Sequence, residues 1–214
     1  MLKDPTSVDL ADIFPEYNSR NPLVRWIFLE RLKICIRLAQ LSTTQPLKIL
    51  DFGCGEGRML RLIREADARH EVTGMDYNRN VLTLNIPGVK VQQADLTDPQ
   101  SLPVEAFDRV FCLDMLEHLK EVEGPIKTLG RALRPDGLLI VSAPSENAFH
   151  KFCRLLLKGK LSKAEGSDYS PHYHCAGTLA RDIMAAGFEV VGGMSLPLPG
   201  PLALLKLYAF RKKR

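Results

Sequence analysis

A glycine-rich turn beside an aspartate carries the strongest chemical signal in this sequence. Residues 49–57, with the sequence ILDFGCGEG, indicate a buried strand, a tight turn and the start of a helix. Glycines in such a turn let the backbone approach a ligand that any Cβ would block, and a helix N-terminus offers free N–H donors. The last glycine position of a dinucleotide-binding fingerprint is occupied by Arg58, so the turn departs from that fingerprint. Asp51 at the strand end favours a ligand with a positive group.

Two further aspartates end the next two predicted strands. Asp76 ends the strand in VTGMD, and Asp95 follows the strand in QQADL. The carboxyl ends of parallel strands meet at one edge of an open α/β sheet, where such sheets bind ligands. At that edge Asp76 can accept hydrogen bonds from both hydroxyls of a ribose, and Asp95 can accept one from an exocyclic amine. The three carboxylates predict a ligand with a positive group, a ribose and an adenine.

The fourth predicted strand leads into a second group of polar residues. Asp114, Glu117 and His118 of the DMLEH segment would share one helical face and could hold a divalent ion. The same residues could instead cap a helix or border a substrate pocket, and we expect no metal. His172 and His174 lie in a predicted loop on the substrate side. We regard His118 and His172 as the candidate general bases.

Short apolar runs that alternate with helical periodicity must position these residues. The pattern predicts one doubly wound α/β domain with a parallel sheet. The predicted strands are residues 47–52, 71–75, 89–94, 107–113, 138–143, 188–192 and 204–211. The predicted helices are residues 23–41, 58–66, 78–84, 122–133, 147–157 and 178–186, with a loop over residues 158–175.

Six segments resemble the class I S-adenosylmethionine-dependent methyltransferases, in particular the small-molecule branch that includes ubiquinone and menaquinone biosynthesis enzymes. The segments are LKILDFGCGEGR, VTGMDYN, QQADL, LPVEAFDRVFCLDMLEHL, LRPDGLLIVSAPS and, more loosely, HYHCAGTLARDIMAAGFEVV. The resemblance implies a Rossmann-like seven-stranded sheet with the last strand antiparallel and helices on both faces. It also implies S-adenosyl-L-methionine as the cofactor.

The resemblance assigns a role to each residue that matches the family pattern. Asp51, Gly53 and Gly55 would surround the methionine portion of the cofactor, and Asp76 would hold the ribose. The remaining roles fall to Tyr77 beside the adenine, Asp95 at its amine, Leu96 behind the ring and Leu113 on the methyl side. Cys54, within the turn, is interpreted as a small packing residue.

The resemblance also suggests that three segments of the single domain, residues 1–214, have different roles. Residues 1–45 would form an N-terminal helical lid, residues 46–145 the cofactor-binding core, and residues 146–214 the substrate-side segment with the last two strands. The leader around Phe14–Tyr17, the helix from Leu23 and residues 145–175 would then enclose the acceptor.

Composition and charge limit the cellular compartment and the classes of partner that we expect for this protein. The five cysteines form no C-x-x-C pair and the N-terminus is too polar for a signal peptide, so we expect a reduced, cytoplasmic protein. The basic, apolar segment KFCRLLLK at residues 151–158 could border a lipophilic pocket or contact a membrane surface. We expect methyl transfer to an oxygen or carbon of a small, hydrophobic molecule and no nucleic acid partner. The basic C-terminal third leaves an RNA or protein methyltransferase, with or without a divalent metal, as the alternative, and a non-catalytic binding protein as a third.

Overall fold

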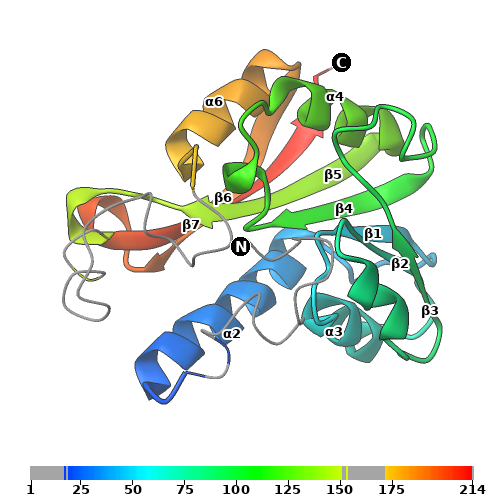
Figure 1. Ribbon diagram of the computed structural model, residues 1–214, viewed down its shortest axis with the longest axis horizontal. Helices are drawn as coiled ribbons and strands as arrows, with labels where there is room; N and C mark the ends of the chain where they lie inside the picture. The colour runs from blue at the N-terminus through cyan, green and yellow to red at the C-terminus, as the bar shows by residue number, and fades with distance from the viewer. Residues whose placement is uncertain (1–16, 18, 151–152, 154–171, 214) are drawn as a thin grey trace, which may run out of the picture.

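A single seven-stranded sheet organises the protein (Figure 1). The computed structural model describes residues 17, 19–150, 153 and 172–213. The strands follow the order β3-β2-β1-β4-β5-β7-β6 across the sheet. Their bounds are β1 Lys48–Phe52, β2 Glu71–Asp76, β3 Val89–Gln93, β4 Phe107–Leu113, β5 Leu133–Pro144, β6 Phe188–Pro197 and β7 Ala203–Lys212.

The strand directions confirm the predicted topology. Strands β1 to β5 pair in parallel, whereas β7 lies between β5 and β6 and runs antiparallel to both. The chain order reverses between β1 and β4, because β2 and β3 lie on one side of β1 and the later strands lie on the other. A crevice at such a reversal is where open α/β sheets bind ligands.

Helices cover both faces of the sheet, as predicted (Figure 1). On one face lie α2 (Pro22–Leu38) and α3 (Arg58–Ala66), whose apolar residues share a buried cluster with Ile49. On the other face lie α4 (Glu123–Ala132) and α6 (Ala176–Ala185), which share a second cluster with Leu50. Adjacent residues of β1 thus serve opposite layers, because side chains alternate across a strand.

Several predicted bounds are wrong, and each difference has a local cause. The first helix ends at Leu38 instead of residue 41, because Gln40 adopts a positive φ of 51°. The fifth strand begins at Leu133 and contains an irregularity, so that Phe107 pairs with Leu133 and Arg109 with Leu138. Residues 134–137 therefore form an irregular part of the strand. β6 runs five residues beyond the predicted end because its antiparallel pairing with β7 continues to Pro197.

One predicted helix and the helical turn expected in the DMLEH segment are short 3₁₀ helices instead. η3 covers Arg79–Thr83, within the predicted helix 78–84, and η4 covers only Leu116–His118 of the DMLEH segment. Most of the predicted helix 147–157 and of the loop 158–175 lies outside the described residues.

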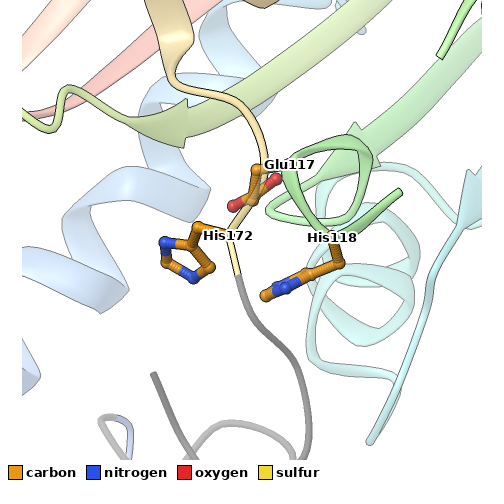
Figure 2. Close-up of side chains that lie close together, drawn as sticks. All are labelled: Glu117, His118 and His172. Atoms are coloured by element: carbon orange, nitrogen blue, oxygen red, sulfur yellow. The ribbon is translucent and has the colours of Figure 1, made fainter. Parts of the chain in front are cut away.

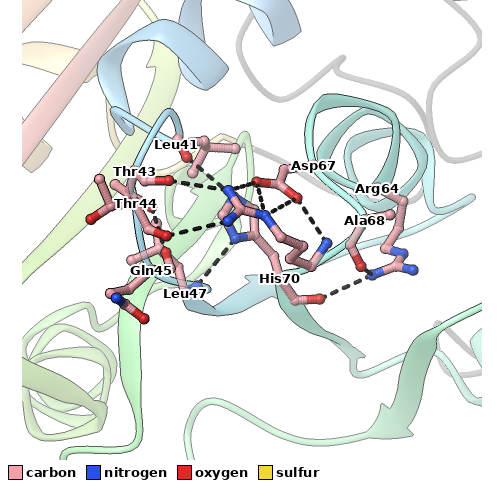
Figure 3. A network of polar contacts seen from close by, with 10 residues as sticks. Leu41, Thr43, Thr44, Gln45, Leu47, Arg64, Asp67, Ala68 and His70 are labelled. Carbon is pink, nitrogen blue, oxygen red and sulfur yellow. Dashed lines mark hydrogen bonds and ion pairs between the residues drawn. The ribbon is translucent and has the colours of Figure 1, made fainter.

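A histidine away from the carboxyl edge of the sheet secures the connection between α2 and β1 (Figure 3). The Leu47 N–H donates to His70 Nδ1 over 3.1 Å, so the Nε2–H of His70 donates to the Leu41 carbonyl over 3.2 Å. Arg69 donates beside it to the carbonyls of Thr43 and Thr44. These contacts make His70 a structural residue with a defined tautomer.

No helix in the described part of the chain is both long and apolar enough to cross a membrane.

Candidate functional site

The glycine turn that follows β1 adopts a backbone that side chains disfavour. Gly53, Gly55 and Gly57 have φ values of +82°, +48° and +75°. The N–H groups of Gly53 and Cys54 both donate to the Met75 carbonyl, over 2.7 and 3.1 Å, which ties the turn to the end of β2. The positive φ of Gly53 favours glycine, and a Cβ there would also lie only 3.1 Å from Met115 Cγ.

Asp51 lies in a pocket with this turn. The pocket is lined by Asp51, Gly53 and Leu113 among other residues, and the Asp51 residue is only 3% exposed. Burial and the nearby charge of Asp76 raise the pKa of the Asp51 carboxyl to about 7, although the Arg31 guanidinium opposes this. A buried carboxyl of this kind gains from a positive ligand group that replaces the lost solvation.

Backbone donors at the sheet edge orient the Asp76 carboxylate. Its Oδ2 accepts from the Gly55 N–H over 2.9 Å, and its Oδ1 accepts from the Asn78 N–H over 2.9 Å. Burial raises the pKa of Asp76, and these two donors counteract that effect. Each oxygen retains a second lone pair for a ligand. Tyr77 is 46% exposed next to it, which leaves its ring accessible.

Asp95 lies farther along the same edge and has a local role. Its Oδ1 accepts from the N–H and from the hydroxyl of Thr97, over 2.9 and 2.7 Å, so the exposed side chain caps a turn. Leu96 is buried behind it. The structure therefore gathers Asp51, Gly53 and Leu113 in one pocket and joins Asp76 to the same turn, whereas Asp95 stays on the surface.

Arg31 of α2 is a pocket residue that the sequence did not single out. It is only 2% exposed, forms an ion pair with Asp114 and donates to the hydroxyl of Tyr17. The Arg58 guanidinium lies 4.6 Å from the centre of the Tyr17 ring. Tyr17, Arg31 and Arg58 all line the pocket of Asp51. The signal in the sequence that could have identified Arg31 is its position between the apolar residues Ile27 and Ile34, which are buried in the structure.

Asp114 does not share a helical face with Glu117 and His118, so that expectation is wrong. Its backbone has a positive φ of 49°, and its carboxylate accepts from the Ser142 hydroxyl over 2.6 Å in addition to its ion pair with Arg31. The positive φ prevents a continuous helix through the DMLEH segment. Asp114 therefore points toward β5 and α2.

Glu117, His118 and His172 form a second polar cluster (Figure 2). One ligand-type atom from each residue lies within 4.8 Å of the others. The His118 and His172 rings have centroids 4.8 Å apart, and the Tyr173 N–H donates to the Glu117 carbonyl over 2.7 Å. This backbone contact brings the segment after residue 171 to η4. His174 instead contacts the Lys120 carbonyl over 3.3 Å.

Burial dominates the electrostatics of this second cluster. Glu117 is 1% exposed, and its Oε2 has no hydrogen-bond partner among the described residues. Desolvation raises the pKa of its carboxyl to about 8. Desolvation also raises the pKa of the Cys54 thiol, which agrees with a packing role for Cys54. The arrangement offers two imidazoles as proton acceptors beside a carboxyl group that is neutral near pH 7.

Comparison with known proteins identifies a family. Residues 26–192 match the family model described as a methyltransferase domain. The trans-aconitate 2-methyltransferase of Acidovorax sp. is 33% identical over 110 residues, which is 50% of this chain and 42% of the relative. The ubiquinone biosynthesis O-methyltransferase of Psychrobacter arcticus is 33% identical over 113 residues, 47% of this chain and 42% of the relative. The chain thus matches less than half of the length of these curated relatives.

Solved structures show the same fold. The N-methyltransferase NodS of Bradyrhizobium japonicum, in complex with S-adenosyl-L-homocysteine, superimposes with a TM-score of 0.68 at 19% identity, covering 96% of this chain and 95% of that chain. The 1,6-didemethyltoxoflavin-N1-methyltransferase of Burkholderia thailandensis gives a TM-score of 0.63 at 17% identity, with coverages of 96% and 87%.

Proposed function

Because the chain belongs to the methyltransferase domain family, which uses S-adenosylmethionine, we propose that it transfers the methyl group of this cofactor to a small molecule. The supporting observation is the pocket that Asp51, Gly53 and Leu113 line at the carboxyl ends of β1 and β4. When bound, S-adenosylmethionine supplies an activated methyl group on a positively charged sulfur. A buried carboxyl group suits the positively charged sulfur, and the glycine turn lets the cofactor lie close to the backbone.

The cofactor residues proposed from the sequence have distinct tasks at this edge. Asp51 would face the positive part of the cofactor, and Gly53 and Gly55 would let the backbone lie against its methionine portion. Asp76 would accept from the ribose hydroxyls, since two backbone N–H groups already fix its carboxylate. Tyr77, Asp95 and Leu96 would surround the adenine, and Leu113 would face the reacting methyl.

His118 and His172 would act as proton acceptors for the methyl acceptor. Their rings lie 4.8 Å apart, and His172 Nδ1 lies 3.1 Å from Glu146 Oε1. If the acceptor atom is a hydroxyl oxygen, one of these imidazoles takes its proton as the oxygen becomes methylated. The protein's other contributions are to orient the acceptor and to exclude water.

The acceptor class rests on the curated relatives. The names of the trans-aconitate and ubiquinone biosynthesis enzymes refer to small molecules, which supports a small-molecule acceptor for this chain. Transfer to oxygen or carbon agrees with the proton acceptors at the site.

Calorimetry tests the proposal without knowledge of the acceptor. S-adenosylhomocysteine should bind the full chain with micromolar affinity, and NAD should not bind. Asp76→Ala should weaken S-adenosylhomocysteine binding by about 10- to 100-fold, because about 1.5–3 kcal/mol is lost with a charged hydrogen-bond acceptor. Asp182→Ala on α6 is the matched control and should bind normally. Binding of NAD without S-adenosylhomocysteine would refute the proposal.

A further inference from the structure

Glu146 follows the carboxyl end of β5 in a backbone conformation that its residue type disfavours. Its φ is +50°, in the left-handed region, where residues other than glycine are uncommon. The neighbouring residues hold this backbone: the Ser145 N–H donates to the Leu204 carbonyl over 2.9 Å, and Asn147 Nδ2 donates to the Ala203 carbonyl over 2.7 Å. A strained backbone that its surroundings stabilise in this way is a reason to look for a function of its side chain.

The Glu146 side chain is directed at histidine. Its carboxylate is 2% exposed, and its Oε1 lies 3.1 Å from His172 Nδ1. Its Oε2 lies 3.9 Å from His150 Nδ1, so two imidazoles face one buried carboxyl group. His172 comes from a segment distant in sequence, which the contact between Tyr173 and Glu117 holds at η4.

The chemistry of the pair determines which nitrogen of His172 carries the proton. With the Glu146 carboxyl group ionised, it can only accept hydrogen bonds, which makes His172 Nδ1 the donor. In the neutral ring the Nε2 atom then has no hydrogen and presents its lone pair. The hydrogen bond made by one ring nitrogen thus sets the function of the other.

We propose that Glu146 is a positioning residue that holds His172 as the Nδ1–H tautomer, so that Nε2 can take a proton from the methyl acceptor. The inference rests on the proposed function and adds a residue to it. As the acceptor oxygen bonds to the methyl carbon, its proton passes to Nε2, and the electron pair of the broken carbon–sulfur bond stays on sulfur. The Glu146 carboxylate then lies beside the positively charged ring that results.

Nitrogen-15 NMR of histidine-labelled protein tests the tautomer directly, without an acceptor. The His172 signals, assigned with His172→Gln, should show a protonated Nδ1 and a bare Nε2 in the neutral ring of the wild-type protein. His70 provides an internal reference of the opposite tautomer, because its Nε2 donates to the Leu41 carbonyl.

Variants separate a positioning role from a purely structural one. Glu146→Ala should shift His172 toward the Nε2–H form, while His70 stays unchanged. Glu146→Gln should restore the Nδ1–H form, because its amide oxygen can still accept. Glu123→Ala on the surface of α4 is the control and should leave His172 as in the wild type. The Nε2–H form in the wild-type protein, or an unchanged tautomer in Glu146→Ala, would overturn the proposal. The wild-type spectrum is decisive alone, so a variant that fails to fold does not block the test. Failure of the methyltransferase proposal would appear separately, as absence of S-adenosylhomocysteine binding.

Discussion

At the scale of single residues, the charge of Asp51 should make ligand binding in the pocket depend on pH. Burial raises the pKa of its carboxyl to about 7, so the group is mostly neutral at pH 6 and mostly anionic at pH 8. The anion should favour the positive sulfur of S-adenosylmethionine over the neutral sulfur of S-adenosylhomocysteine. The two ligands differ only in the methyl group and the charge of the sulfur, so their relative affinity isolates this effect.

We therefore expect the affinity ratio of S-adenosylmethionine to S-adenosylhomocysteine to rise by about tenfold from pH 6 to pH 8. The magnitude follows because a nearby opposite charge lowers a carboxyl pKa by about one or more. Calorimetry with both ligands at each pH measures the ratio. Asp51→Asn removes the titrating group and should give a constant ratio. A wild-type ratio that does not change with pH would contradict this role for Asp51.

The cluster of Glu117, His118 and His172 is expected to function without a metal. A carboxyl group must lose its proton to coordinate a cation, whereas burial raises the pKa of Glu117 to about 8. Glu146 already occupies Nδ1 of His172, and Asp114 is paired with Arg31.

Titration with Mn²⁺ at pH 7 should give no saturable binding in the wild-type protein or in His118→Ala. Stoichiometric binding to the wild-type protein that is lost in both His118→Ala and Glu117→Gln would show that the cluster is a metal site. His174→Ala, which changes a neighbouring histidine outside the cluster, is the control for nonspecific binding.

At the scale of elements, Tyr17, which precedes α2, lines the pocket of Asp51. Sequence reasoning placed the leader around Phe14–Tyr17 on the acceptor side. In the structure Tyr17 is buried, accepts from Arg31 and lies beneath the Arg58 guanidinium in the pocket of Asp51. Tyr17 therefore lies in the part of the site that we assign to the cofactor.

We expect Tyr17→Ala to weaken S-adenosylhomocysteine binding by about tenfold, because it removes a buried aromatic ring from the pocket. Tyr17→Phe keeps the ring and should retain most of the affinity. Trp26→Ala, which removes an exposed aromatic ring from α2, is the matched control. Calorimetry distinguishes the variants, and normal binding by Tyr17→Ala would place the leader on the acceptor side after all.

At the scale of the whole molecule, the basic C-terminal residues are part of the sheet. The net charge is +4, and the sequence ends in RKKR. Arg211 and Lys212 belong to β7, and the Lys212 ammonium donates to the Leu133 carbonyl over 2.6 Å. Lys213 donates its N–H to the Gly187 carbonyl over 2.8 Å. The Lys212 side chain is thus engaged in a structural contact, and the sheet holds the backbones of Arg211 and Lys213.

We therefore expect only weak, nonspecific binding of RNA. Filter binding with a mixed-sequence single-stranded RNA should give dissociation constants of about 10⁻⁴–10⁻⁶ M that weaken steeply between 50 and 200 mM salt. Submicromolar binding that persists at 200 mM salt would favour the RNA methyltransferase alternative instead.

Local patterns in the sequence determined the sheet and its ligand-binding edge. Apolar runs and helical periodicity are properties of neighbouring residues, so they indicate strands and helices before any tertiary contact is known. The strand-end position of Asp76 follows from the same patterns. The glycine turn at residues 53–57 does too, because glycine permits the positive φ values found there. The bounds of β6 were less predictable, because its length depends on pairing with β7.

Only the tertiary structure decided which side chains meet. Arg31 and Asp114 are far apart in sequence, yet they form a buried ion pair, and Glu146 and His172, also far apart, approach to 3.1 Å between Oε1 and Nδ1. Neither pairing follows from spacing, because each depends on how α2, β5 and the segment after residue 171 pack against the end of β4. That packing removed Asp114 from the expected DMLEH face and left His118 and His172 together beside Glu117. Long-range packing therefore decides the chemistry of this site, even though local sequence decides the elements that carry it.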